Sequence, residues 1–243
     1  MSISILSNVS AMQASRQLGI TNQGLQKTIQ RLTTGKRINN ANDDAAGLAI
    51  ANGLTADMKI AAQGQRNVND ALTTLNTNDG YLQEATNLGL RATELAAQGA
   101  STAADSEWGQ IVSSINAIMG KVSASVKAHA GQFGDITTTI TATTDLAATS
   151  ATAGANATAA QATMDSINAA RSDIGAGMQS LQAYSNVLGI QVENSTAQVS
   201  QIMDADISAE VVNLSKYQIL SQAGTFALQQ ANASAQSILS LLR

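Results

Sequence analysis

The sequence contains no cysteine and no proline, and aromatic residues make up only 2% of its 243 positions. The missing cysteine excludes a disulfide scaffold, a thiolate metal site and a cysteine nucleophile. Aromatic side chains bury roughly 150 to 250 Å² each and usually dominate compact cores, so their scarcity argues against a globular enzyme core. Charged residues are also few, at 12%, although hydrophobic residues reach 44%. The abundant small residues favour closely packed helices.

Groups for acid, base or nucleophilic chemistry are equally scarce. His129 is the single histidine, in a segment typical of a turn (HAGQFG), so neither a zinc-binding pair nor a serine triad can be placed. Asp204, Asp206 and Glu210 admit a reading as calcium ligands, but the spacing is incomplete for an EF-hand, and acidic residues at a helix start are ordinary caps. We expect no enzyme, no cofactor and no metal site.

Two other classes are disfavoured by the pattern of charge. The first 19 residues have no lysine or arginine before Arg16 and no sustained apolar stretch, so we expect no Sec signal peptide. Residues 217–242 lack charge, but polar side chains interrupt them too often for a membrane span. Lys36, Arg37 and Arg31 form a small basic cluster, yet the net charge is -4 and aromatic platforms are missing, so nucleic acid is not expected as a partner.

Apolar residues recur every seven positions in the first half of the chain. A first helix carries Ala11, Leu18, Leu25 and Leu32 and ends at Gly35. After a connector over 36–42, a second helix starts at Asn42 or Asp43 and reaches Gly99, with the stripe Ala61, Val68, Leu75 and Leu82. The glycines inside it (Gly47, Gly53, Gly64, Gly80 and Gly89) each cost about 1 kcal/mol relative to alanine, which predicts close packing against neighbouring helices.

The middle of the chain changes its pattern. A link over 100–106 leads to a third helix from Trp108 to Val126, and residues 129–134 read as a turn. Residues 136–143 alternate with period two, which predicts a strand or hairpin. The low-complexity stretch 149–158 predicts a loop.

The second half repeats the helical pattern. Ile167, Ile174, Leu181 and Leu188 mark a long helix to about Met203, in which the pair Gly175 and Gly177 is read as helix packing, and a last helix follows a cap at 204–206. The predicted fold class is therefore mainly α: an elongated antiparallel coiled-coil or helical bundle with a small β-hairpin in the middle.

The distribution of carboxylates is the most informative feature. None occurs before Asp43 and none after Glu210, so both terminal helices lack acidic residues. Helices this poor in charge gain their stability from packing, and we expect them to order fully only among other copies of the chain. The sequence thus predicts a subunit that polymerises.

Two segments carry a family resemblance. Residues 31–50 (RLTTGKRINNANDDAAGLAI) and residues 202–216 (IMDADISAEVVNLSK), with the closing SILSLLR, resemble the N- and C-terminal signatures of bacterial flagellins. The resemblance covers about residues 1–128 and 160–243, and only about 129–159 remain for the outer domains that many flagellins carry. It implies a short-form subunit of the extracellular flagellar filament, used for swimming and exported by the type III apparatus.

This resemblance implies a division of the chain and a set of partners. The segments are an inner-core helix with its connector (1–42), rod helices (43–128), a hairpin and loop region (129–159), a rod helix (160–203) and a second inner-core helix (204–243). The partners are the chain itself as a helical homopolymer, an export chaperone, and cap and hook-junction proteins. The expected core assembly seam consists of Leu18, Leu25, Ile29, Leu32, Leu214, Leu220, Leu228, Ile238 and Leu242.

Two further sites are expected. We read the basic cluster of Arg31, Lys36 and Arg37 as an inter-subunit contact with Asp43 or Asp44. By analogy with flagellins sensed by a Toll-like receptor, Arg91 and Leu95, one helical turn apart, would be a receptor contact, although Ser114 occupies the place of its supporting acidic residue; a subunit contact is the alternative.

Two other protein classes compete with the flagellin reading. A chemoreceptor-like hairpin is also rich in alanine and heptads, but it requires membrane spans that the sequence does not offer. A hook-filament junction protein shares the terminal helices and ranks second.

Overall fold

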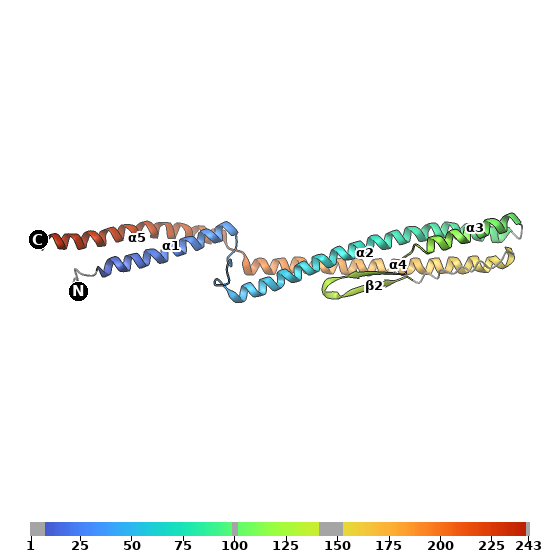
Figure 1. The fold of residues 1–243 in the computed structure, drawn as a ribbon, viewed down its shortest axis with the longest axis horizontal. Coiled ribbons are helices and arrows are strands. Elements are labelled where there is room, and N and C mark those ends of the chain that lie inside the picture. Colours follow the sequence, from blue (N-terminus) through green and yellow to red (C-terminus); the bar gives the residue numbers. More distant parts are fainter. Residues whose placement is uncertain (1–7, 99–101, 141–152, 242–243) are drawn as a thin grey trace. The chain divides into compact units, whose positions relative to one another are not determined.

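The computed structural model describes residues 8–98, 102–140 and 153–241, without the side chains of 102–105, 153–157 and 235–241. Along the chain run α1 (Val9–Thr34), α2 (Ala45–Gln98), α3 (Thr102–Met119), β1 (Ser125–His129), the short 3-10 helix η1 (Gly131–Phe133), β2 (Asp135–Thr139), α4 (Ala153–Met203) and α5 (Ile207–Leu241) (Figure 1). The predicted class, a mainly α helical bundle with a small β-hairpin in the middle of the chain, is confirmed.

The chain divides into two compact units. Unit 1 comprises Met1–Thr55 and Thr196–Arg243, and unit 2 comprises Ala56–Ser195. In unit 1, α1 and α5 lie side by side (Figure 1). A small apolar cluster of Ile38, Ala51 and Met203 lies beside the segment that connects α1 to α2.

The core of unit 2 is built from the seven-residue stripes. Ala61, Val68, Leu75 and Leu82 of α2 are at most 2% exposed, as are Ile167, Ile174, Leu181 and Leu188 of α4. Trp108, Ile111, Ile115 and Met119 of α3 complete the same apolar cluster. Both predicted long helices are therefore confirmed, and their stripes are buried as expected.

The hairpin begins earlier in the chain than the sequence predicts. Prediction of the third helix to Val126 was wrong, because α3 ends at Met119 and Val126 lies in β1. The spacing of Met119, Val122 and Val126 fits a helix by coincidence, whereas the alternating burial of β1, which pairs antiparallel with β2, is that of a strand. The predicted turn at 129–134 is confirmed by η1 and the left-handed Gly131 and Gly134.

Two predicted connections are shorter than expected. The link over 100–106 gives way to α3 at Thr102, and the loop over 149–158 gives way to α4 at Ala153; these predictions were wrong for the helical positions. Residues 99–101 and 141–152 lie outside the described part of the chain. The stretch 149–158 has low complexity because it is rich in alanine. Alanine is also the best helix former, which favours the helix from residue 153 onward.

Glycine lets the hairpin approach the helices closely. A Cβ on Gly64 of α2 would lie 3.0 Å from the backbone of Ala130 and Gly131, and a Cβ on Gly177 of α4 would overlap the Thr138 side chain of β2. The predicted packing against a neighbouring helix is confirmed for Gly89, where an added Cβ would overlap the Met164 side chain of α4, whereas Gly64 and Gly177 pack against the hairpin. The prediction is wrong for Gly53, Gly80 and Gly175, around which no atom lies near enough to touch an added Cβ. In the described residues, no helix is long and apolar enough to cross a membrane.

Candidate functional site

The interface between α1 and α5 is antiparallel and made largely of small and half-buried residues. Asn8 Nδ2 donates to the Ala231 carbonyl at 2.9 Å, and the Ser221 hydroxyl donates to Asn22 Oδ1 at 3.3 Å. At the other end, the Arg31 guanidinium meets Glu210. Residue numbers therefore rise along α1 as they fall along α5.

Threonine and glycine hold the centre of this interface. Thr21 and Thr28 are buried, and Leu18, Leu25 and Leu32 are half-buried around them. A Cβ on Gly224 of α5 would lie 3.8 Å from the Leu18 Cβ. The two backbones approach closely there because a glycine faces a large side chain.

The predicted assembly seam divides into residues inside and outside this interface. Leu18, Leu25, Leu32, Leu214 and Leu228 are half-buried in unit 1. Ile29 and Leu220 are 47% and 41% exposed. The side chain of Ile238 and all of Leu242 lie outside the described residues.

A second apolar stripe lies on the opposite side of α5. Val212, Ile219 and Phe226 follow one another at intervals of seven and are 65–68% exposed. At about 100° per residue this line lies on the face of α5 turned away from Tyr217, Gly224 and the other α1-facing positions. Sequence reasoning missed this stripe, although its seven-residue spacing would have revealed it.

The outward side of α1 is apolar as well. Val9, Met12 and Ile20 are each more than half exposed and lie on the face opposite Leu18 and Leu25. Both terminal helices thus carry apolar residues on two sides. Within one chain, α1 and α5 cover one side of each other and leave the second side exposed.

A joint of backbone hydrogen bonds closes one end of the helix pair. Gly35 ends α1 in the left-handed conformation, as predicted, with φ of 69°. Lys36 and Asp204 then form an antiparallel bridge, in which Ala205 N donates to Gly35 O at 2.9 Å and Arg37 N donates to Met203 O. We call residues 35–44 and 203–206, with the flanking Lys27, Arg31 and Glu210, the joint.

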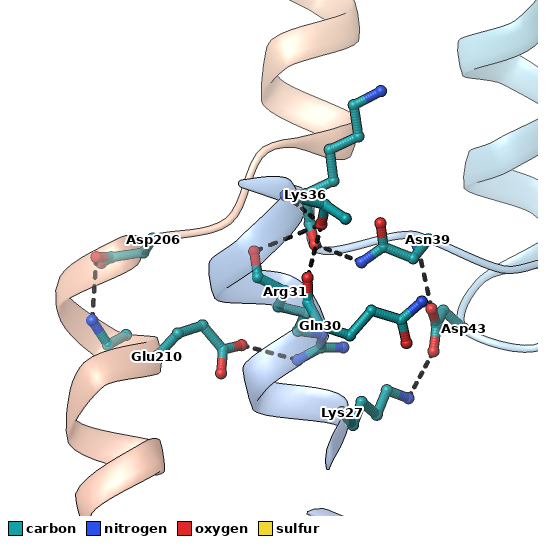
Figure 2. A network of polar contacts seen from close by, with 10 residues as sticks. Lys27, Gln30, Arg31, Lys36, Asn39, Asp43, Asp206 and Glu210 are labelled. Carbon is teal, nitrogen blue, oxygen red and sulfur yellow. Dashed lines mark hydrogen bonds and ion pairs between the residues drawn. The ribbon is translucent and has the colours of Figure 1, made fainter. Parts of the chain in front are cut away.

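The charged residues of the joint pair within one chain. Arg31 Nη1 lies 2.9 Å from Glu210 Oε1, and Lys27 Nζ lies 2.6 Å from Asp43 Oδ1 (Figure 2). Arg37 Nη2 donates to the Ile202 carbonyl, and the Lys36 side chain extends away from the network. Arg31 and Asp43 thus have partners within the chain, and the predicted contact of Arg31, Lys36 and Arg37 with Asp43 or Asp44 of another subunit stays a prediction.

The carboxylates of the joint also organise the backbone. Lys27 and the backbone N–H of Asn39 lower the pKa of Asp43 from 3.8 to about 2. Asp44 Oδ1 accepts from Gly47 N, so Asp44, rather than the predicted Asn42 or Asp43, caps α2. Asp206 Oδ1 accepts from Ala209 N and caps α5, as predicted for this segment.

The predicted receptor pair does not share a surface. Arg91 is exposed and pairs with Glu94 and with Glu107, which raise its pKa above the usual value. Leu95 is 3% exposed in the core of unit 2. The acidic residue of α3 that pairs with Arg91 is Glu107, which the sequence reasoning did not identify.

The single histidine lies in the hairpin, at the end of β1. His129 Nδ1 contacts Asp135 Oδ1 at 2.7 Å across the hairpin, with both side chains exposed. The described residues contain no group of three histidine, aspartate or glutamate side chains placed to hold a metal ion. What the arrangement offers is apolar helix surface.

Comparison with known proteins gives matches at both ends of the chain. Residues 5–126 match the family described as bacterial flagellin N-terminal helical region, and residues 157–242 match the bacterial flagellin C-terminal helical region. The flagellar filament 30.7 kDa core protein of Treponema maltophilum is 32% identical over 97% of this chain and 98% of its own length. The flagellin of Halalkalibacterium halodurans is 33% identical over the same shares of the two chains.

The matches therefore cover nearly the whole chain, and the two relatives are flagellar filament proteins. The chain belongs to the bacterial flagellin family and is a structural subunit of the flagellar filament, not an enzyme.

Proposed function

We propose that copies of this chain polymerise by covering the outward faces of α1 and α5 in one another. Self-association is the general property of flagellins, and the proposal assigns it to particular residues. The exposed stripe of Val212, Ile219 and Phe226 is the single observation that carries it. The predicted seam residues Ile29 and Leu220, which the helix pair leaves exposed, join the same contact.

The driving force is burial of apolar surface. Each Å² removed from water contributes about 25 cal/mol, and ordering of the terminal helices opposes it. Several neighbours must therefore contact one helix before association is favourable, so growth of the polymer is cooperative. The inner half of the seam, Leu18, Leu25, Leu32, Leu214 and Leu228, positions α1 and α5 for these contacts.

The remaining partners follow from the family resemblance alone. They are an export chaperone, cap and hook-junction proteins, and release outside the cell through the flagellar type III apparatus. Recognition of Arg91 by a Toll-like receptor also stays a prediction. It would have to use Arg91 without Leu95, because the latter is covered by its own chain.

The test uses an exposed position, so that folding of the single chain is preserved. Ile219→Asp places a carboxylate on the outward stripe, where it has no packing partner to lose in the free chain. Electron microscopy after seeding should show no filaments, while circular dichroism of the monomer stays unchanged. Gln218→Asp, about a quarter turn away on the same exposed helix, is the matched control and should polymerise. Normal filaments from Ile219→Asp would contradict the proposal.

A further inference from the structure

The apolar residues between α1 and α5 do not by themselves specify a single register of one helix against the other. On α1, Ala11, Leu18, Leu25 and Leu32 repeat every seven residues, and on α5 so do Leu214, Ser221 and Leu228. If one helix moves by seven residues along the other, apolar and small residues face one another again. Burial of the seam therefore distinguishes poorly between the observed register and its neighbours.

The ion pair between α1 and α5 distinguishes the observed register from the displaced ones. Among the described residues, Arg31–Glu210 is the one ion pair that joins α1 to α5. Glu210 is 7% exposed. In a pairing displaced by seven residues, the Glu210 carboxylate would face the region of Gly24 or of Ile38, and Arg31 would lose its partner. An unpaired charge in such an interface is strongly unfavourable.

The pair is also a poor device for stability alone. Arg31 Nε and Glu210 Oε2 are buried, and neither has a hydrogen-bond partner among the described residues. Buried ion pairs of this kind are often no more stabilising than apolar residues of the same size, and their best-attested role is to select a register.

We propose that Arg31 and Glu210 determine the register in which the terminal helices pair: they select the observed register over pairings that are displaced by seven residues along the helix. Within one chain the joint supports this register through its backbone bridge. The ion pair adds to this support, because only the observed register brings Arg31 to Glu210. The inference concerns pairing within one chain and goes beyond the proposed function.

The absence of cysteine from the chain makes the register directly measurable. A Cβ on Gly224 would lie 3.8 Å from the Leu18 Cβ, within the about 3.5–4.5 Å that a disulfide requires. Leu18→Cys with Gly224→Cys therefore reports the observed register. Ala11→Cys or Leu25→Cys with Gly224→Cys report pairings displaced by seven residues, about 10 Å along the helix.

The decisive variant removes both charges together. In Arg31→Leu with Glu210→Leu, apolar side chains replace the pair, so circular dichroism should still show the helices. We expect the ratio of displaced disulfides to the native disulfide to rise by roughly tenfold or more. Exchange of the charges, Arg31→Glu with Glu210→Arg, should return the ratio toward that of the parent chain.

A second ion pair serves as the matched control. Lys27→Leu with Asp43→Leu removes the other pair of the joint, which does not connect α1 to α5, and should leave the disulfide ratio unchanged. The inference is overturned if the Arg31/Glu210 variant keeps the parent ratio, if the control shifts it equally, or if the exchanged pair stays at the level of the apolar variant. These disulfides form in the free chain, so failure of the polymerisation test would leave this result intact, and the reverse also holds.

Discussion

Unit 1 and unit 2 use the same seven-residue repeat with different results. In unit 2, Val68, Leu75, Ile167 and Leu188 are completely excluded from solvent. In unit 1, the corresponding leucines of α1 and α5 are half-buried, and Phe226 is 68% exposed. Repeats of apolar residues therefore indicate which helix faces become buried. The number of neighbouring helices and strands decides whether that burial is complete within one chain.

The difference has a simple geometric cause. In unit 2, α3 and the hairpin supply buried residues to the same core as α2 and α4. In unit 1, α1 and α5 have mainly each other, and two helices can cover only one face of each. A core that is complete in the single chain and a helix pair that is incomplete should respond differently to substitution.

The largest effect is expected on polymerisation. Leu25→Asp or Leu228→Asp places a carboxylate in the half-buried seam of unit 1, where it lacks a partner. Filaments should be absent by electron microscopy, whereas the thermal transition of unit 2 should stay where it is. Loss of the unit 2 transition together with the filaments would show that the two units depend on each other more than this comparison allows.

The next largest effect is expected on the stability of unit 2, whose core is complete in the single chain. Leu75→Ala removes a completely buried side chain of α2 and should lower the free energy of unfolding by about 2–5 kcal/mol in chemical denaturation. Leu90→Ala, at a position 52% exposed on the same helix, is the control and should change it by less than about 0.5 kcal/mol. Equal effects of the two would mean that the stripe is not the core of unit 2.

Substitution of two glycines that lie two residues apart should change the stability of unit 2 in opposite directions. Gly177→Ala would press a methyl group into the buried Thr138 of β2 and should destabilise unit 2 by about 1–3 kcal/mol. Gly175→Ala meets no atom and should stabilise the same helix by about 0.4–1 kcal/mol. Thermal unfolding of the two variants measures both; a stabilising Gly177→Ala would show that the hairpin does not need this close approach.

Much of the fold could be predicted from local pattern, and the errors have physical causes. Helix interiors follow from heptads and the end of α1 from Gly35. The hairpin boundary failed because Val122 and Val126 satisfy both helical spacing and strand alternation, and only pairing with β2 decides between them. Local pattern carries no information about such distant pairing.

The site was predicted less completely than the fold. The leucines of the seam lie half-buried in unit 1 as their spacing indicates, and their part in assembly stays a prediction. The partners of Arg31 and Asp43 were not found, since Arg31 pairs with Glu210, which is 179 positions away, and Asp43 with Lys27. Such pairs follow from the register of α1 against α5 and from the path of the connector, neither of which a single sequence displays.

The smallest effect is expected from the ion pair at the edge of the joint. Asp43 has a pKa of about 2 in the folded chain against an ordinary 3.8, so its contribution is complete above about pH 4 and is lost as the pH falls through about 2. Asp43→Asn should therefore lower the stability of unit 1 slightly at neutral pH, because Lys27 is half exposed and solvent screens the pair. The difference from the parent chain should shrink between pH 4 and 2 when helix content is followed by circular dichroism. Asp57→Asn, an exposed carboxylate with no ion pair in the described part of the chain, is the control and should show no such convergence. A difference that persists unchanged at pH 2 would mean that Asp43 acts through the backbone of Asn39 and Asn40 and not through its charge.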